Sequence, residues 1–319
     1  MLTLGRKLLQ ITVVFVVVTF FTVFLMSLVP GKPENVVIPF DASPGQQITK
    51  EFRAENNLDK PLPVRWAKWA GKFVTGDMGY LYSSSDKTPV STGIKKGAPV
   101  TFLLILYTQI FALMVAIPLA VLAAYRSGKR TDKALNTVMF GFISLPGFAI
   151  ALTLSYFLGV RLGLVPAQGY TGPTENLVKH FQSMVVPVLA LGLGQIAIYM
   201  RLLRSDLVAT LQEDFILMAK SKGISNTRVL WRHALRPSSL TLLTVAGLSI
   251  GNLIGGTLVV EYLLGIPGLG LQVGNAIFAR QYVQLQSLVA IIAISFVLIN
   301  FLIDFLYTIL DPRIREHSS

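Results

Sequence analysis

Long runs of apolar residues alternate with short polar segments along almost the whole chain. A helix needs about 20 residues to cross the hydrocarbon layer of a bilayer. Six runs reach that length, at approximately 8–29, 100–125, 135–160, 184–203, 239–262 and 285–310. The pattern therefore predicts an all-helical integral membrane protein with six transmembrane spans.

The spans divide the chain into parts of different character. An N-terminal transmembrane helix, 1–29, precedes a more polar region, 30–99, and a transmembrane core, 100–310, precedes a short tail, 311–319. The first apolar run is too long for the core of a signal peptide, and Pro30-Gly31 follows it instead of a small-residue cleavage pattern. We interpret it as an uncleaved span. Aromatic residues and a turn-like Gly76–Gly79 sequence in 30–99 predict a small packed cap.

Basic residues in the short loops indicate the orientation. They gather after the second span, after the fourth span and in the tail, at Arg126, Lys129, Arg130, Lys133, Arg201, Arg204, Lys220, Lys222, Arg228, Arg232, Arg236, Arg313 and Arg315. The opposite short loops hold only Arg161, Lys179 and Arg280. Both termini are therefore expected in the cytoplasm. Region 30–99 carries ten basic residues and is still expected outside, because long loops translocate largely regardless of charge.

Composition supports the membrane interpretation. The chain is 53% hydrophobic and 14% charged, whereas soluble domains average about 25% charged residues. The absence of cysteine excludes disulfides and thiolate metal sites. The formal net charge of +12 is explained by basic loops on one side of a bilayer, so we expect no nucleic-acid partner.

An amphipathic segment rich in Lys and Arg, 206–237, lies between the fourth and fifth apolar spans. Leu211, Phe215 and Met218 recur at helical spacing and would share one face. Gly223 is a helix stop, and Ser225 or Asn226 can cap a second short helix that carries Val229, Leu230 and His233 on one side. Two short helices joined by a glycine turn would form a rigid knob for a partner. An interfacial helix on lipid headgroups is the alternative, and these residues alone leave both open.

This segment resembles the cytoplasmic "EAA" loop of ABC-importer permeases, in particular those of the peptide/nickel family. The matching positions are Asp214-Phe215, Ala219-Lys220-Ser221-Lys222-Gly223 and His233-Ala234-Leu235-Arg236. Two positions depart from the general pattern, because Leu217 stands where that pattern has Glu and Pro237 comes one position late.

Further motifs extend the resemblance over nearly the whole chain, to the dipeptide/oligopeptide "B" permeases. They are Leu58–Pro63 and Gly76–Gly79 in the external region, Ser144–Phe148 in the third span, Glu261 with Ile266–Gly270 before the last span, and Asp311–Arg313 at the end. The resemblance implies a six-helix permease with a MetI-like core and a small extracytoplasmic cap, in a bacterial cell membrane.

The resemblance also implies a function and partners. The chain would be one half of the pathway of an ATP-driven peptide importer, beside a homologous second permease. Two ATPase subunits, or one fused ATPase, would bind the ATP, and an extracytoplasmic binding protein would deliver the peptide. Nickel complexes, haem and glutathione are alternative cargoes of similar permeases. The ATPase-docking residues implied in this sequence are Asp214, Phe215, Ala219, Lys222, Gly223, Ser225, Arg228 and His233.

Two further groups of residues are candidates for contacts. Polar or small residues within spans usually face protein or water, and we note Gln195, Gly251, Asn252 and Gly255 as pathway or helix-interface candidates. Helix–helix packing is the simpler interpretation of each. In the external region, the candidates for contact with the binding protein are Trp66, Trp69, Asp77 and Tyr80.

The chain carries no recognisable catalytic or cofactor motif. Gly128-Lys129 lacks the upstream glycine of an ATP-binding loop. The GxSxG match at Gly247–Gly251 lies inside an apolar span, and His180, His233 and His317 lack metal-ligand spacing. We therefore expect a non-catalytic subunit without a cofactor. An ion-coupled transporter would need intramembrane carboxylates, for which only Asp304 is available, near a span end.

Overall fold

The computed structural model describes residues 2–28, 47–82 and 87–310 of the 319-residue chain. The first part of the predicted cap and the predicted tail lie outside these residues, and so does the side chain of Asp304. The chain separates into two compact units, residues 1–101 with 267–301 and residues 102–266 with 302–319. Residues 267–301, which we had assigned to the transmembrane core, thus group with the N-terminal part of the chain.

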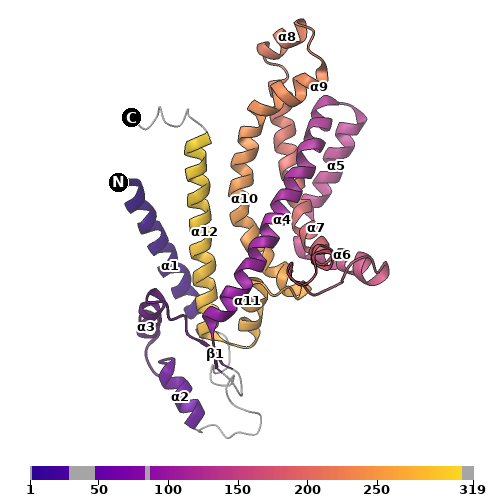
Figure 1. Cartoon of the computed structure of the whole chain (residues 1–319). Helices are drawn as coiled ribbons and strands as arrows, with labels where there is room; N and C mark the ends of the chain where they lie inside the picture. The colour runs from indigo at the N-terminus through magenta and orange to yellow at the C-terminus, as the bar shows by residue number, and fades with distance from the viewer. Residues whose placement is uncertain (1, 29–46, 83–86, 311–319) are drawn as a thin grey trace. The chain divides into compact units, whose positions relative to one another are not determined.

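Helices dominate the described residues, and the long ones coincide with predicted spans (Figure 1). Five are long and apolar enough to cross a membrane: α1 (Leu2–Leu28), α4 (Val90–Tyr125), α7 (Leu177–Thr210), the continuous helix Asn226–Leu264 that contains α10 (Leu235–Leu264), and α12 (Tyr282–Leu310). A sixth is reached if one bent pair of helices counts as a single span. The prediction of a helical membrane protein is confirmed, with one short pair of strands outside the predicted spans.

The third predicted span is the exception, because it is not one continuous helix. It comprises α5 (Arg130–Ser144) and α6 (Gly147–Leu154), which the π-helix η2 (Ser155–Arg161) continues, and the two parts are bent by 99°. Pro146 has no N–H to donate, and its ring forces Leu145 into an extended conformation with ψ of 131°. The span predicted over 135–160 is therefore helical on both sides of a sharp bend at Pro146.

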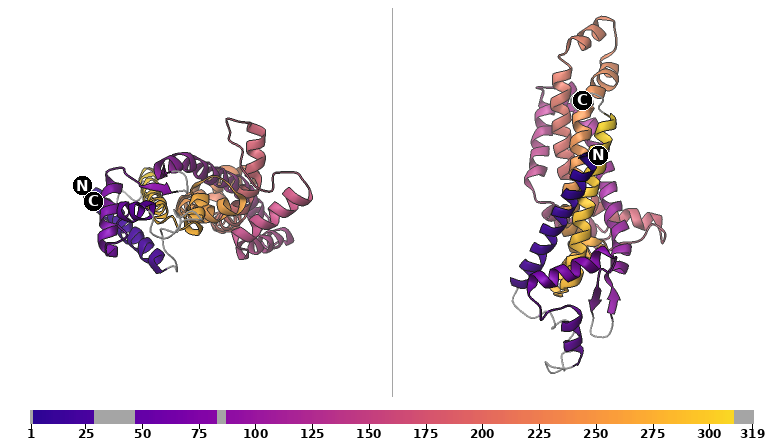
Figure 2. Two further views of the ribbon diagram at one scale, coloured as in Figure 1. Left: turned by 90° about the horizontal axis from the view of Figure 1, so that it is seen from below. Right: turned by 90° about the vertical axis from the view of Figure 1, so that its left-hand side faces the viewer.

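The larger unit is built around α7, which packs against α10, α5 and α6 (Figures 1 and 2). Ala112, Ala116 and Ala120 of α4 are fully buried at four-residue spacing, which lets helices approach closely. Gln109 links these helices, since its Oε1 accepts from the Tyr199 hydroxyl and its Nε2 donates to the carbonyl of Ala246, both at 3.1 Å.

The smaller unit contains α1, α12 up to residue 301, and the cap, by which we mean the described elements between residues 47 and 89. These are α2 (Gln47–Glu55), α3 (Leu62–Val74) and an antiparallel pair, β1 (Tyr80–Tyr82) and β2 (Lys87–Pro89), with Leu81 opposite Thr88. The unit also holds α11 (Leu269–Phe278). Trp69 and Phe73 of α3 bury their rings against Phe15 of α1 and Ala290 of α12. Apolar packing thus fixes α3 to the two spans.

Candidate functional site

The 206–237 segment forms a projection beyond the ends of α7 and α10 (Figures 1 and 2). After α7 ends, a short helix, α8 (Asp214–Ser221), runs to a turn at Gly223, whose φ is +77°. The Gly223 amide donates to the Lys220 carbonyl at 2.9 Å, and the next amide donates to the Ala219 carbonyl at 3.3 Å. A left-handed glycine therefore closes α8 as the sequence predicts.

The second predicted helix is not a separate short helix. It starts as α9 (Asn226–Arg228), continues as the π-helix η3 (Val229–Ala234) and passes without a break into α10. Ser225 occupies the N-cap position in an extended conformation, but its side chain makes no capping hydrogen bond. The knob is thus one short helix folded back beside the first turns of a long span.

The inner side of this projection belongs to the core of the larger unit. Ile216 and Ala219 of α8 and Val229, Leu230 and Ala234 of η3 are buried, and they join a cluster that includes Ala123 and Ala124 of α4. Burial of these side chains on a common base holds α8 in place. Ala219, one of the predicted docking residues, therefore supports the projection from inside.

The outer side of the projection exposes large apolar residues. Phe215, Leu217 and Met218 of α8 are 46%, 54% and 59% exposed, and Trp231 of η3 is also exposed. Leu211 is half-buried in the turn before α8, so Leu211, Phe215 and Met218 do not share one face of a single helix as predicted. Exposed apolar side chains on a rigid projection are typical of a surface that another molecule covers.

The remaining predicted docking residues lie around this surface. His233 is half-buried, whereas the others are exposed, namely Asp214, Phe215, Lys222, Gly223, Ser225 and Arg228. Their exposure makes them accessible to a partner. The exposed residue at the position of the family's Glu is Leu217, so the surface is more apolar there than the general pattern.

Two polar contacts that the sequence did not reveal anchor the base of the projection. Thr210, the last residue of α7, and Ser238 of α10 have hydroxyls 2.9 Å apart. Asp132 of α5 accepts from Nε and Nη2 of Arg204 on α7, both at 2.5 Å. In the sequence, Arg204 contributes only to the predicted orientation of the chain. Asp132, an acidic residue within an otherwise basic loop, is the one feature of the sequence that could indicate this ion pair.

The pathway candidates fall into two groups. Gly251 is buried and Gln195 is half-buried, and no described residue lies within hydrogen-bonding distance of the Gln195 Oε1. Asn252 and Gly255, three residues apart on α10, are exposed, and a Cβ on Gly255 would meet nothing within 4 Å. This face of α10 is therefore open within the described chain.

In the cap, the two tryptophans point inward. The Trp69 Nε1 donates to Ser287 of α12 at 3.2 Å, and the Trp66 Nε1 donates to Thr19 of α1 at 3.0 Å. Trp69 is buried and positions α3. It therefore does not offer the surface for the binding protein that the sequence suggested. Asp77 and Tyr80 are exposed and remain available for a contact.

Comparison with known proteins identifies the family. Residues 116–316 match the family of binding-protein-dependent transport system inner membrane components. The match covers more than half of the chain. The chain belongs to this family. The permease is thus the membrane component of a transport system that depends on a binding protein.

Relatives match over nearly the full length of the permease. It is 34% identical to the probable peptide ABC transporter permease protein y4tP of Sinorhizobium fredii, over 97% of this chain and 98% of that protein. It is also 34% identical to the oligopeptide transport system permease protein AppB of Bacillus subtilis, over 93% of this chain and 94% of that one.

A solved structure supports the predicted fold. The methionine ABC transporter MetNI, in inward-facing conformations, aligns with a TM-score of 0.56 and 17% identity, over 69% of the permease and 96% of the matched chain. The prediction of a MetI-like core is confirmed. Within the described ranges, no three His, Cys, Asp or Glu residues are grouped so as to hold a metal ion.

Proposed function

We propose that the permease forms half of the translocation pathway of an ATP-driven importer of peptides. The cargo is inferred from the names of its relatives, which describe peptide and oligopeptide permeases. The observation that carries the mechanism is the 206–237 segment, where an exposed apolar surface sits on a buried base. Nickel complexes, haem and glutathione are the alternative cargoes that a transport assay must separate from peptides.

In this mechanism the 206–237 segment docks into the ATPase. Phe215, Leu217 and Met218 supply apolar contact, and exposed Lys222 and Arg228 surround them with positive charge. Because the inner side of α8 is packed on α4 and η3, a push on α8 moves the span ends with it. ATP binding and hydrolysis take place on two ATPase subunits or one fused ATPase, and the permease itself is non-catalytic and needs no cofactor.

A second, homologous permease completes the pathway in our proposal. The open face of α10 around Asn252 and Gly255 is a suitable contact surface, because a polar side chain beside a glycine suits another helix or a polar pathway better than lipid. The two permeases would form a heterodimer. Rigid-body movement of its halves, driven by the ATPase, would alternate access to the cavity between them.

The cap is the proposed contact for the extracytoplasmic binding protein. Asp77 precedes the hairpin and Tyr80 is its first residue; both are exposed and are the residues that we assign to this contact. The placement agrees with the basic loops, which favour cytoplasmic termini and a cytoplasmic 206–237 segment. The permease is thus assigned to the bacterial inner membrane as a multi-pass protein that lipid surrounds.

Reconstitution of the complete transporter tests the proposal. We expect the binding protein to stimulate both ATP hydrolysis and uptake of labelled peptide, and nickel, haem and glutathione to give no uptake. Replacing Phe215 with Glu should disturb the apolar docking surface, whereas replacing exposed Gln212 with Glu is a matched control outside it. Normal coupling in the Phe215→Glu transporter would contradict ATPase docking at this surface, and uptake of another cargo would reassign the substrate.

A further inference from the structure

A cavity of about 190 Å³ lies in the smaller unit, between the cap and the ends of α1 and α12. Its walls come from α1 through Thr22, Val23 and Met26, from α2 and α3, from the hairpin, and from residues 281–283 and 286 at the start of α12. Because both α1 and α12 are candidate membrane spans and the cavity lies at the cap end of each, it opens where hydrocarbon meets water.

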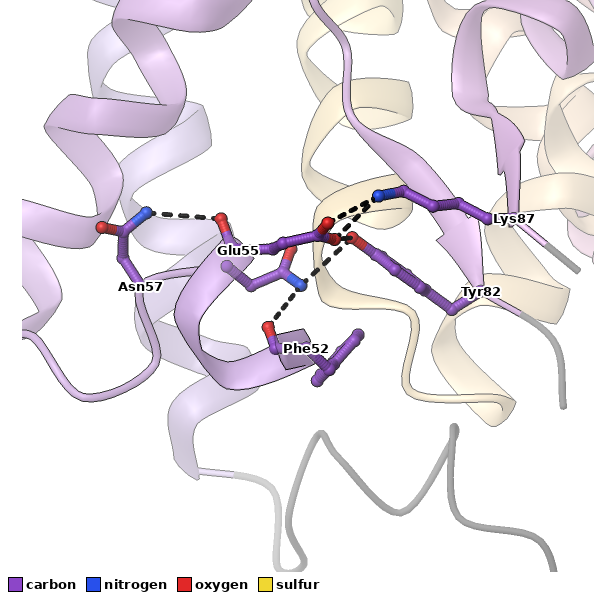
Figure 3. A network of polar contacts seen from close by, with 6 residues as sticks. Phe52, Glu55, Asn57, Tyr82 and Lys87 are labelled. Atoms are coloured by element: carbon purple, nitrogen blue, oxygen red, sulfur yellow. Dashed lines mark hydrogen bonds and ion pairs between the residues drawn. The ribbon is translucent and has the colours of Figure 1, made fainter. Parts of the chain in front are cut away.

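Positive charge predominates in this cavity. Its lining includes Arg65, Lys68, Lys72 and Lys87 but only two carboxylates, Glu55 and Asp77. Both carboxylates already have partners. Glu55 accepts from Lys87 Nζ at 2.8 Å and from the Tyr82 hydroxyl at 2.7 Å (Figure 3), and Asp77 accepts from the Gly79 amide at 3.0 Å. The cavity therefore has an excess of cations over available anions.

Two donors in the lining lack an acceptor. Gln286 is only 5% exposed, and its Nε2 has no hydrogen-bond partner. The Arg65 guanidinium is half-buried and makes no hydrogen bond or ion pair with any described residue. Burial lowers the pKa of Arg65, because water leaves the guanidinium and no carboxylate beside it compensates. A buried donor without a partner is costly, so Gln286 points to a ligand that supplies an oxygen acceptor, and half-buried Arg65 adds positive charge to the same lining.

The other side of the cavity is apolar. Val23 and Met26 of α1 and Trp69 of α3 contribute to the lining. Just outside it, α1 exposes Phe21, Phe24 and Leu25, which suits contact with acyl chains. A matching ligand carries a negative, oxygen-rich head on an apolar body and resides at the membrane surface.

We propose that this cavity binds the headgroup of an anionic phospholipid. The phosphate accepts hydrogen bonds from Arg65 and Gln286. The rest of the headgroup lies near Lys68 and Lys72, and the acyl chains leave the cavity along α1. A volume of about 190 Å³ accommodates a headgroup but not a whole lipid. The inference needs only that α1 and α12 span the membrane, so it depends on neither the cargo nor the orientation.

Native mass spectrometry of the full-length permease tests the assignment, with phosphatidylglycerol or phosphatidylcholine added to the detergent. We expect phosphatidylglycerol adducts on the original protein and about fivefold fewer on the Arg65→Gln variant, since a basic residue near an anionic headgroup contributes roughly that factor. Arg53→Gln is the matched control. It removes the same charge from the cap, but Arg53 pairs with Asp59 at 2.6 Å outside the cavity, so adducts should persist.

A second variant protects the test against misfolding. Gln286→Leu keeps the approximate volume of a buried side chain, so it should leave the melting temperature near the original value and still reduce phosphatidylglycerol adducts. Equal adducts in Arg65→Gln and Arg53→Gln, or equal binding of phosphatidylcholine, would overturn the proposal. Displacement of the lipid by glycerol phosphate at equal concentration would instead assign the cavity to a soluble anion, and displacement by a dipeptide would assign it to the proposed cargo.

Discussion

At the scale of single residues, the backbone torsion of Gly223 shapes the exposed surface of the 206–237 segment that we propose docks into the ATPase. Gly223 has a φ of +77°, a conformation that L-residues with a Cβ rarely adopt. A Cβ built at this position would have nothing within 4 Å, so a substitution there is strained without any clash. The effect of a larger residue is therefore confined to the path of the chain between α8 and α9.

Replacing Gly223 with Val should uncouple transport. The left-handed conformation costs a branched residue about 1–3 kcal/mol, which the chain relieves by reshaping the turn. We expect normal membrane insertion but at least a tenfold loss of uptake, measured in the reconstituted transporter beside the abundance of the permease. Gly223→Asn should be milder, because Asn tolerates this conformation better.

Gly163 provides the matched control for that substitution. It also has a positive φ, of +62°, and open space around a Cβ, but it lies in the loop that follows η2. Gly163→Val thus introduces a similar strain away from α8 and should leave uptake within about twofold. Equal defects in both variants would mean that strain in general, and not the shape of the 206–237 segment, reduces transport.

Glu55 makes the cap sensitive to acid. Hydrogen bonds from Lys87 and then Tyr82 lower the pKa of this carboxyl, and they tie α2 to the hairpin (Figure 3). A lowered pKa in the folded state gives stability that is complete above the ordinary glutamate value, about 4.3, and is lost as the pH falls toward the folded value. We expect protection of α2 amides from hydrogen exchange, corrected for intrinsic rates, to fall between about pH 5 and 3.

Two substitutions separate the contribution of Glu55 from that of other carboxylates. In Glu55→Gln the acid-dependent change in α2 should disappear, and protection should be low at every pH. Asp59→Asn removes an exposed carboxylate that binds Arg53, so the transition should remain. An unchanged transition in Glu55→Gln would show that another group is responsible.

At the scale of elements, hydrophobic runs predict helices well and their interruptions poorly. Each predicted apolar run corresponds to helix in the structure, because about 20 apolar residues in lipid must satisfy their backbone internally. Prolines show the limit of this argument. Pro187 remains inside α7, whereas Pro146 ends α5 with a bend of 99°. Because both prolines lie in apolar runs, a proline in such a run does not by itself show whether the helix continues or breaks.

Contacts between residues distant in sequence could not be predicted either, and the ion pair of Asp132 with Arg204 is the clearest case. The Asp132 side chain is 4% exposed and joins α5 to α7. Removing one partner of a buried ion pair leaves an uncompensated charge, so Asp132→Ala should destabilise the permease by up to about 3 kcal/mol. We expect a lower melting temperature in detergent, measured beside Asp214→Asn, which removes an exposed carboxylate. Equal melting temperatures for the two variants would contradict a structural role for this pair.

At the scale of the whole molecule, the sequence predicts the class of protein and the position of its coupling segment, but not which residues face a partner. The motif at Asp214–Gly223 located the projection, because a basic amphipathic segment between apolar runs is unusual. It could not distinguish Ala219, which is buried, from Met218, which is exposed. That distinction depends on how α8 packs against α4 and η3. The cap cavity was hidden for the same reason, since its walls come from residues as far apart as Thr22 and Gln286.

At this scale, the bend between α5 and α6 also leaves two ways to count the membrane crossings of the chain. If the pair crosses the membrane, the chain has six crossings and the 206–237 segment lies on the side opposite the cap. If the pair entered and returned on one side, the chain would have five crossings and the 206–237 segment would lie on the same side as the cap. The membrane would then separate that segment from the end of α4, whereas α8 packs against Ala123 and Ala124 there. The basic residues of this segment favour six crossings, because Lys and Arg in short loops stay in the cytoplasm.

Single cysteines in this cysteine-free chain distinguish these two topologies. Suitable exposed positions are Lys60 in the cap, Glu175 after η2 and Gln212 before α8. With six crossings, an impermeant thiol reagent added to intact cells should label the Lys60→Cys and Glu175→Cys variants, and Gln212→Cys only after the cells are opened. With five crossings, Glu175→Cys and Gln212→Cys exchange their behaviour. Labelling of Gln212→Cys in intact cells would therefore contradict both the six-span topology and a cytoplasmic ATPase on the 206–237 segment.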